Sequence, residues 1–256
     1  MVLRFAPVYH SHIGGASTGE PGELEGTPGV ASATRVWPDV EPADGARSQG
    51  EEAYLRIRDR IICLDMPPGS VVNEGRLREE LQIGRTPIRE ALQRLARENL
   101  VRSVPHRGTF VADVNITDLA RITEVRVVLE AHAARLAAEK LTAADRAPIE
   151  QLLDVLEHGG VTDQRQLMEL DQQVHRLVYR AARNAFLEAT LERYFNLSLR
   201  LWYLVLDTGV RLREAVDEHV RLLQAVLAGD AAEAEDVMRR HVVGFEREIR
   251  KELVER

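Results

Sequence analysis

Apolar residues recur at helical spacing in two short stretches on either side of Gly84. Such spacing keeps one stripe of a helix facing a core, so it predicts two short amphipathic helices separated by a tight turn. The apolar positions are Leu77, Leu81 and Ile83 in the first stretch, and Ile88, Ala91, Leu92, Leu95 and Leu100 in the second.

The residues of the second helix indicate where it begins and give it a basic outer face. Thr86 can accept a backbone N–H as the N-cap, and Pro87 suits the first helical position because its missing donor costs nothing there. The pattern predicts an end near residue 98. Arg85 and Arg89 lie one turn apart and can project from the same exposed face while Ile88 points inward. Such a face suits the major groove of DNA.

Two β-prone runs follow this helix, at residues 100–104 and 109–111. The residues between them favour a turn, so we expect a β-hairpin with a basic tip, as in a winged helix. The turn residues are Pro105, His106, Arg107 and Gly108.

A further helix is expected before this pair, over residues 51–64, and Pro67 and Pro68 end it. It completes a three-helix head at residues 49–114. After the head, strand signals disappear and the rest of the chain is helical in character. We expect a bundle of six or seven helices, with helices near residues 117–139, 143–157, 163–182, 185–206, 211–228 and 231–254.

The net charge of −7 is unusual for a DNA-binding protein, but the charge is unevenly distributed. Residues 51–115 carry eleven basic and ten acidic side chains, whereas residues 116–256 carry 20 and 25. Between Arg85 and Arg107 there are six arginines and two glutamates. Basic charge is therefore concentrated where the head would meet a groove.

Composition bounds the remaining possibilities for the chain. No apolar run approaches the ~20 residues that span a bilayer, so we expect a soluble, cytoplasmic protein without a membrane partner. The single cysteine, Cys63, excludes an internal disulfide and a cysteine-based zinc site. Residues 1–48 are rich in Gly, Pro, Ser, Ala and Glu and lack a sustained period, so we expect them to be disordered.

Four residues of the C-terminal part form a candidate metal site. Asp171 and His175 lie four positions apart and project from one face of a helix. His219 and His241 fall on two later helices and are flanked by apolar residues that aim them at the bundle interior. An Asp and three His suit Zn, Ni, Mn or Co. The alternative for each histidine taken alone is an ordinary core position.

The head resembles the GntR family of bacterial transcription regulators, on the motif RTPIREAL, the preceding N-E-x-x-L and the hairpin P-x-R-G-x-F-V. The resemblance implies base or phosphate contacts from the helix and minor-groove contacts from the wing tip. The implied DNA-binding residues are Arg85, Thr86 and Arg89, with Arg76 as a weaker candidate, and His106, Arg107 and Gly108.

One position departs from the family pattern, because Gly84 stands where Ser or Thr usually precedes R-T-P. A hydroxyl that could cap the helix or touch phosphate is missing. Glycine is a tolerable N-cap that costs only a few tenths of a kcal/mol relative to serine. We therefore expect the fold to be kept, whereas the affinity for the operator is an open question.

Residues 117–250 resemble the all-helical FCD effector domain of FadR-like GntR regulators, on LDQQVHRLVYRAARN, EHVRLLQAVLAGDAAEAEDVMRRH and VRVVLEAHAARLAA. The resemblance implies that Asp171, His175, His219 and His241 bind a metal. It also places at Arg126 an arginine that is well shaped to grip a carboxylate. The alternative for Arg126 is a solvated surface side chain.

Together these features predict a transcription regulator, in the repressor class, that binds a pseudo-palindromic operator as a homodimer. A small organic acid would switch it at the metal site and Arg126. One alternative is a metal-dependent hydrolase-like enzyme, disfavoured because no general base is evidently placed. Another is a DNA-binding dimer whose C-terminal bundle, residues 115–256, is purely structural.

Overall fold

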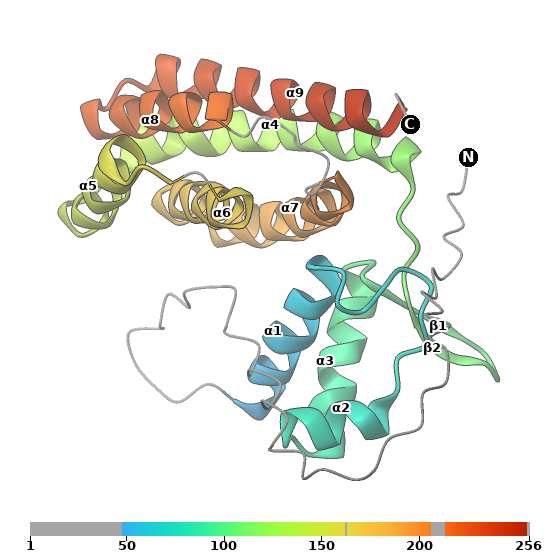
Figure 1. Cartoon of the computed structure of the whole chain (residues 1–256). Coiled ribbons are helices and arrows are strands. Elements are labelled where there is room, and N and C mark those ends of the chain that lie inside the picture. The colour runs from blue at the N-terminus through green and yellow to red at the C-terminus, as the bar shows by residue number, and fades with distance from the viewer. Residues whose placement is uncertain (1–47, 162, 206–212, 255–256) are drawn as a thin grey trace, which may run out of the picture.

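The computed structural model describes residues 48–161, 163–205 and 213–254. Figure 1 shows a small head below a larger helical bundle. The head contains α1 (Gln49–Ile62), α2 (Glu74–Leu81), α3 (Arg85–Arg97), β1 (Val101–Val104) and β2 (Gly108–Val111). The bundle contains α4 (Ile116–Lys140), α5 (Ala143–His158), α6 (Gln164–Ala181), α7 (Ala185–Val205), α8 (Arg213–Ala228) and α9 (Ala231–Val254).

Local capping sets where the head helices begin. The Ser48 side chain accepts the backbone N–H of Glu51, so α1 starts two residues earlier than expected. The helix also ends two residues earlier than expected, at Ile62. Asn73 accepts the N–H of Arg76 at the start of α2. The expected N-cap of α3 was wrong, because Gly84 occupies that position and Thr86 lies inside the first turn. The reason is that the chain is already helical at Arg85, and Gly84 caps without a side-chain hydrogen bond.

The hairpin pairs β1 with β2 in antiparallel register, from Val101 opposite Val111 to Val104 opposite Gly108. Its turn uses two left-handed residues, His106 at φ 60° and Gly108 at φ 103°. The value at Gly108 is far more accessible to glycine than to other residues, which explains glycine at this point of the wing. The predicted mostly α fold with a winged helix-turn-helix is confirmed.

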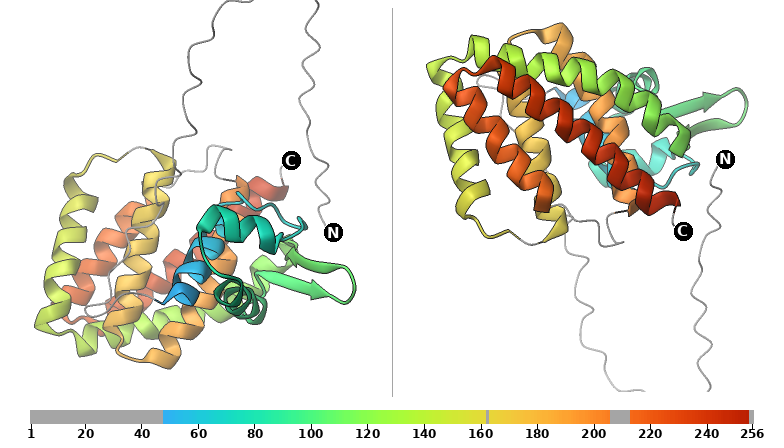
Figure 2. Two further views of the ribbon diagram at one scale, coloured as in Figure 1. Left: turned by 90° about the horizontal axis from the view of Figure 1, so that it is seen from below. Right: turned by 90° about the horizontal axis from the view of Figure 1, so that it is seen from above.

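The bundle helices lie within two residues of the predicted bounds, although residues 206 and 211 fall outside the described part of the chain. The two longest helices, α4 and α9, run side by side, with α8 next to α9 (Figure 2). Beneath them, α6 and α7 form a second layer that faces the head (Figure 1). The expectation of disorder at the N-terminus falls, except for Ser48, outside the described residues.

Two apolar cores exist, one in the head and one in the bundle, and they meet at α1 and α7. Ile62 of α1 belongs to the bundle core, whereas Leu197 of α7 packs against the head core. Arg200 of α7 donates from Nη2 to the carbonyl oxygen of Ala112 at 2.6 Å, just after β2. The head is thus tied to the bundle by apolar contact and by this part-buried hydrogen bond. In the described ranges, none of the helices combines the length and apolarity that crossing a bilayer requires.

Candidate metal centre and nucleic-acid interface

The N-terminal turn of α3 presents the side chains that the sequence nominates for DNA. Ile88 is fully buried, whereas Arg85, Thr86 and Arg89 are exposed, as one turn of an amphipathic helix requires. Arg89 donates from Nε to a Glu74 carboxylate oxygen at 3.0 Å. An exposed ion pair of this kind is worth about 0 to 1 kcal/mol, so DNA phosphate can compete for Arg89.

Further exposed cations lie on α2 and on the wing. Arg76 is exposed and pairs with Glu80 one turn later on α2. His106, Arg107 and Gly108 form the exposed tip of the hairpin, which projects away from the head in Figure 1. The side chains of Arg76 and Arg107 are thus free of the core and can meet a polyanion.

Three helices bring the four predicted metal ligands together inside the bundle. Asp171 and His175 come from α6, His219 from α8 and His241 from α9, and each is at most 5% exposed. One ligand atom from each residue lies within 4.8 Å of the others. A coincidence of three ordinary core histidines would not require their nitrogens to converge.

The separations between these atoms fit a single small cation. The Nε2 atom of His241 lies 3.1 Å from that of His175 and 3.2 Å from that of His219. Asp171 Oδ1 lies 3.4 Å from His219 Nε2 and 3.7 Å from each of the other two Nε2 atoms. An ion about 2.1 Å from every donor would set neighbouring donors roughly 3.0 to 3.4 Å apart, so three of these separations fall in that range and the two at 3.7 Å are slightly longer. The other oxygen of Asp171, Oδ2, is buried and has no hydrogen-bond partner among the described residues.

Two glutamates hold the histidine rings from behind. Glu130 of α4 lies 2.6 Å from His175 Nδ1, and Glu218 of α8 lies 2.9 Å from His241 Nδ1. A carboxylate on Nδ1 leaves the Nε2 lone pair free to face a metal and raises its basicity. Both Nε2 atoms therefore point at the common centre, where a metal would bind them in place of a proton.

The electrostatics of the cluster favour positive charge at its centre. Burial opposes ionisation of His241, yet hydrogen bonds that its ring donates to Asp171 and Glu218 raise its pKa to about 9. Burial also raises the pKa of Asp171, but nearby histidines outweigh it and hold that pKa well below its usual value. Burial, followed by His241, lowers the pKa of His219, so this ring is neutral and can donate a lone pair. A divalent cation would supply the charge that these carboxylates favour.

Arg126 is part of this network and not a surface side chain, so the solvated alternative was wrong. It is 2% exposed, and its Nε donates to Glu130 Oε1 at 2.6 Å. Its guanidinium also lies 5.2 Å from the centre of the Phe195 ring. Burial raises the pKa of Glu130, but Arg126 and then His175 lower it to about 2, so Glu130 is ionised. Arg126, Glu130 and His175 form a continuous buried chain of hydrogen bonds.

Sequence reasoning did not single out Glu130, Glu218 or Tyr179. Glu130 stands one helical turn after Arg126, and Glu218 directly precedes His219, so both carried a spacing signal. Tyr179 stands one turn after His175, and its hydroxyl lies 3.4 Å from His175 Nδ1. Phe195 packs against His175 at 4.7 Å between ring centres and so lines the site.

Comparison with known proteins agrees with both parts of the structure. Residues 49–111 match the family described as "Bacterial regulatory proteins, gntR family", and residues 121–244 match the FCD domain. The chain is 31% identical over 199 residues to a protein of Paenarthrobacter nicotinovorans named "Probable D-xylose utilization operon transcriptional repressor". This match covers 74% of the chain and 85% of the relative.

A second relative and two solved structures extend the likeness. LutR of Bacillus subtilis is a transcriptional regulator that is 29% identical over 71% of this chain and 92% of its own. The fold is shared with E. coli McbR/YncC, at TM-score 0.70 and 22% identity, over 81% of this chain and 100% of that one. A GntR structure from Rhodococcus sp. RHA1 gives TM-score 0.64 at 20% identity, over 80% and 99% of the two chains.

The matched family and the named relatives are transcription regulators, so the enzyme alternative is set aside. The chain carries a GntR-type DNA-binding head followed by an FCD domain. It therefore belongs to the GntR family of bacterial transcription regulators, in the FadR-like branch that is defined by the FCD domain.

Proposed function

We propose that this regulator represses transcription in the cytoplasm by binding a pseudo-palindromic operator as a homodimer, and that a small organic acid switches it at a metal centre. Residues 49–114 would form the DNA-binding domain, and residues 115–256 the effector-binding and dimerisation domain. Two heads would then meet half-sites about one helical turn apart. Repression is supported by a relative that is named as a repressor.

The observation that carries the proposal is the convergence of four donor atoms from three helices at one buried point. Asp171, His175, His219 and His241 would hold a divalent cation, with Zn, Ni, Mn and Co as the candidates. When bound, the ion offers open coordination positions that a carboxylate oxygen can occupy. Glu130 and Glu218 would keep two of the histidines in the ligating tautomer.

Arg126 would bind the effector's carboxylate, and Glu130 links it to the ligand His175. Its guanidinium is buried next to Phe195 and Phe245, at 5.2 and 5.5 Å from the ring centres, where an organic anion would be largely shielded from water. Because Glu130 already takes its Nε, the remaining N–H groups are the ones that could bind a carboxylate. The proposed effector is therefore an acid small enough to reach both groups.

The route from the metal centre to the head runs through α4. This helix carries Arg126 and Glu130, and it begins five residues after β2 ends at Val111. An effector can shift the heads only if it binds two arrangements of the dimer with different affinity. A contact with α4 gives it a direct means of doing so.

The test combines metal analysis with operator binding by the full chain. Purified protein is expected to contain about one equivalent of a divalent metal per chain, and His219→Ala to lower that content while operator binding in the absence of effector is kept. His132→Ala, at an exposed position of α4, is the matched control. Full metal content in His219→Ala, or a metal-free wild type that takes up none of the four ions, would leave the bundle as a structural dimerisation unit.

A further inference from the structure

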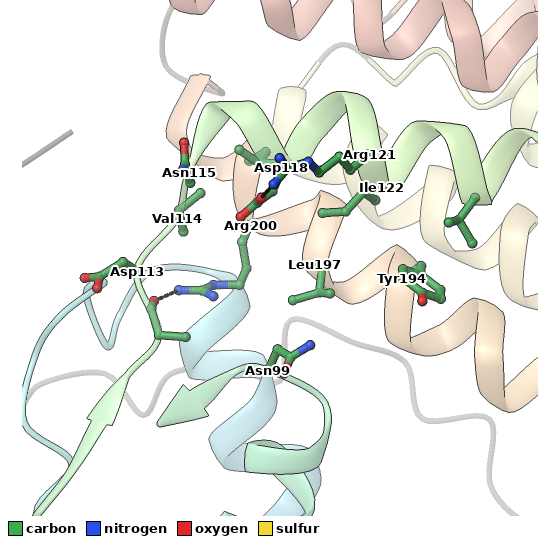
Figure 3. A pocket seen from close by; sticks show the side chains of 13 residues that line it. Asn99, Asp113, Val114, Asn115, Asp118, Arg121, Ile122, Tyr194, Leu197 and Arg200 are labelled. Carbon is green, nitrogen blue, oxygen red and sulfur yellow. Dashed lines mark hydrogen bonds and ion pairs between the residues drawn. The ribbon is translucent and has the colours of Figure 1, made fainter. Parts of the chain in front are cut away.

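A cleft lies where the head joins the bundle, and none of the four candidate metal ligands lines it. Its volume is about 510 Å³, within the range of small-molecule sites. Its walls come from the segment between β2 and α4, from the first turns of α4, from α7 and from Asn99 after α3 (Figure 3). The cleft therefore spans the joint between the two parts of the molecule.

Arg200 supplies this cleft with a buried cation. It is 2% exposed, and Figure 3 shows it reaching from α7 to the linker, where Nη2 donates to the Ala112 carbonyl. Its Nε is buried without a hydrogen-bond partner, and in the described ranges no carboxylate lies within ion-pair distance of it. Burial lowers the pKa of Arg200 to about 10, and Asp113 offsets this only in part. A buried guanidinium with one carbonyl partner lacks the counter-charge that such groups usually have.

The rest of the lining limits what could provide that counter-charge. Ile122, Val125 and Leu201 add an apolar wall beside Leu197. The carboxylates of the lining already have cationic partners: Asp113 lies 3.6 Å from Arg102, and Asp118 lies 3.4 Å from Arg121. These carboxylates would repel a second negative charge on an occupant, because like charges at this range disfavour binding.

We propose that this cleft is a second ligand site, for a monoanion that has an apolar ring body, such as an aromatic monocarboxylate. The carboxylate pairs with Arg200, and the ring lies against Ile122, Val125 and Leu197. The site is independent of the metal centre. Because its walls come from both the linker and the bundle, an occupant stabilises the arrangement of head and bundle in which both walls are present.

The probe is 2-naphthoate, and its uncharged analogue 2-naphthamide is the control for the ligand charge. Binding to the full chain is measured by isothermal titration calorimetry. Arg200→Gln removes the charge and keeps a donor for the Ala112 carbonyl. Val125→Phe fills the cleft and leaves Arg200 intact. The matched control is Val128→Phe, on the outer face of α4, where Val128 is 59% exposed.

We expect the wild type to bind 2-naphthoate at least tenfold more tightly than 2-naphthamide. Arg200→Gln and Val125→Phe should each weaken binding of 2-naphthoate at least tenfold, whereas Val128→Phe and His219→Ala should leave it unchanged. If Arg200→Gln does not fold, Val125→Phe still decides the matter. No binding to the wild type, equal affinity for the two probes, or loss of binding in His219→Ala alone would overturn the proposal.

Discussion

Glu130 is fully buried and contacts two side chains at once, Arg126 and His175. One carboxylate oxygen accepts from Arg126 and the other lies 2.6 Å from His175 Nδ1. A carboxylate in this position is tolerated in an apolar bundle only because both oxygens are satisfied. At the scale of the residue, the candidate metal centre is therefore a network in which every charge depends on its neighbour.

Arg126→Leu should strongly destabilise the fold. The substitution leaves Glu130 buried with only His175 and Tyr179 near it, and breaking a buried ion pair from one side costs about 3 to 5 kcal/mol. Urea unfolding of the metal-free protein measures the change in the free energy of unfolding. Arg121→Leu, at an exposed ion pair on the same helix, should stay within about 0.5 kcal/mol. A loss below 1 kcal/mol in Arg126→Leu would contradict a buried pair.

Glu218→Gln tests the support of the metal ligands separately from stability. The Glu218 side chain is 38% exposed and accepts from His241, so its loss leaves no buried charge unpaired. Removing a carboxylate that orients a ligating histidine typically lowers metal affinity about 10- to 100-fold. Competition with a chromophoric chelator measures that affinity. Asp217→Asn, on the exposed position just before it, should leave the affinity unchanged.

At the scale of the element, α3 presents its proposed DNA-reading side chains from a single turn at its N-terminus. Its buried stripe holds the head core, and its N-terminal turn stays exposed with a glycine cap. The capping position has room for a side chain, because a Cβ at Gly84 would meet only Pro87 Cδ at 3.7 Å. The helix start could therefore accept a capping side chain without a clash.

Gly84→Ser should stabilise the head by a few tenths of a kcal/mol, because its hydroxyl can accept an orphan N–H of the first turn. Gly84 has φ −64°, a value that serine adopts without strain. Thermal unfolding is the measurement, and Gly84→Ala is the control, since alanine fills the same space and caps poorly. A Gly84→Ser variant no more stable than Gly84→Ala would show that the cap is irrelevant here.

Arg89→Ala should cost about 1 to 3 kcal/mol in operator binding if Arg89 reads a base edge. Fluorescence anisotropy with operator and with scrambled DNA separates base reading from phosphate contact. Arg97→Ala, at the exposed C-terminal end of α3, should change operator affinity far less. If Arg89→Ala weakens binding equally on both DNAs, the residue contacts phosphate and not bases.

At the scale of the whole molecule, the sequence predicts those features of the fold that short residue patterns determine. Helical periodicity located the bundle helices, because each buries one stripe, and turn residues located the wing. Four-residue spacing and the family resemblance nominated the metal ligands. The contact of Glu130 with His175 was missed because the two residues are 45 positions apart, and that of Arg200 with Ala112 because they are 88 positions apart. Such pairings depend on how helices cross, which no short pattern records.

Removal of the metal should lower the stability of the bundle as a whole. Saturation of a site at about 100 times its Kd contributes about 2.7 kcal/mol to the native state. Thermal unfolding before and after dialysis against EDTA should show this loss, and re-addition of a divalent ion should restore it. His219→Ala should unfold at a temperature that neither treatment changes. An EDTA-insensitive wild type would argue against a bound metal.

Because α4 is one continuous helix, a tilt about one point along it displaces its ends. Glu130 lies fourteen residues beyond the start of the helix at Ile116, a distance of about 21 Å along the axis. With the pivot at Glu130, a tilt of about 5° displaces the linker end by about 2 Å. In the proposed regulator, a rearrangement of a few ligating atoms would therefore be magnified before it reaches the head, and a dimer would double the change in the spacing of its two α3 helices.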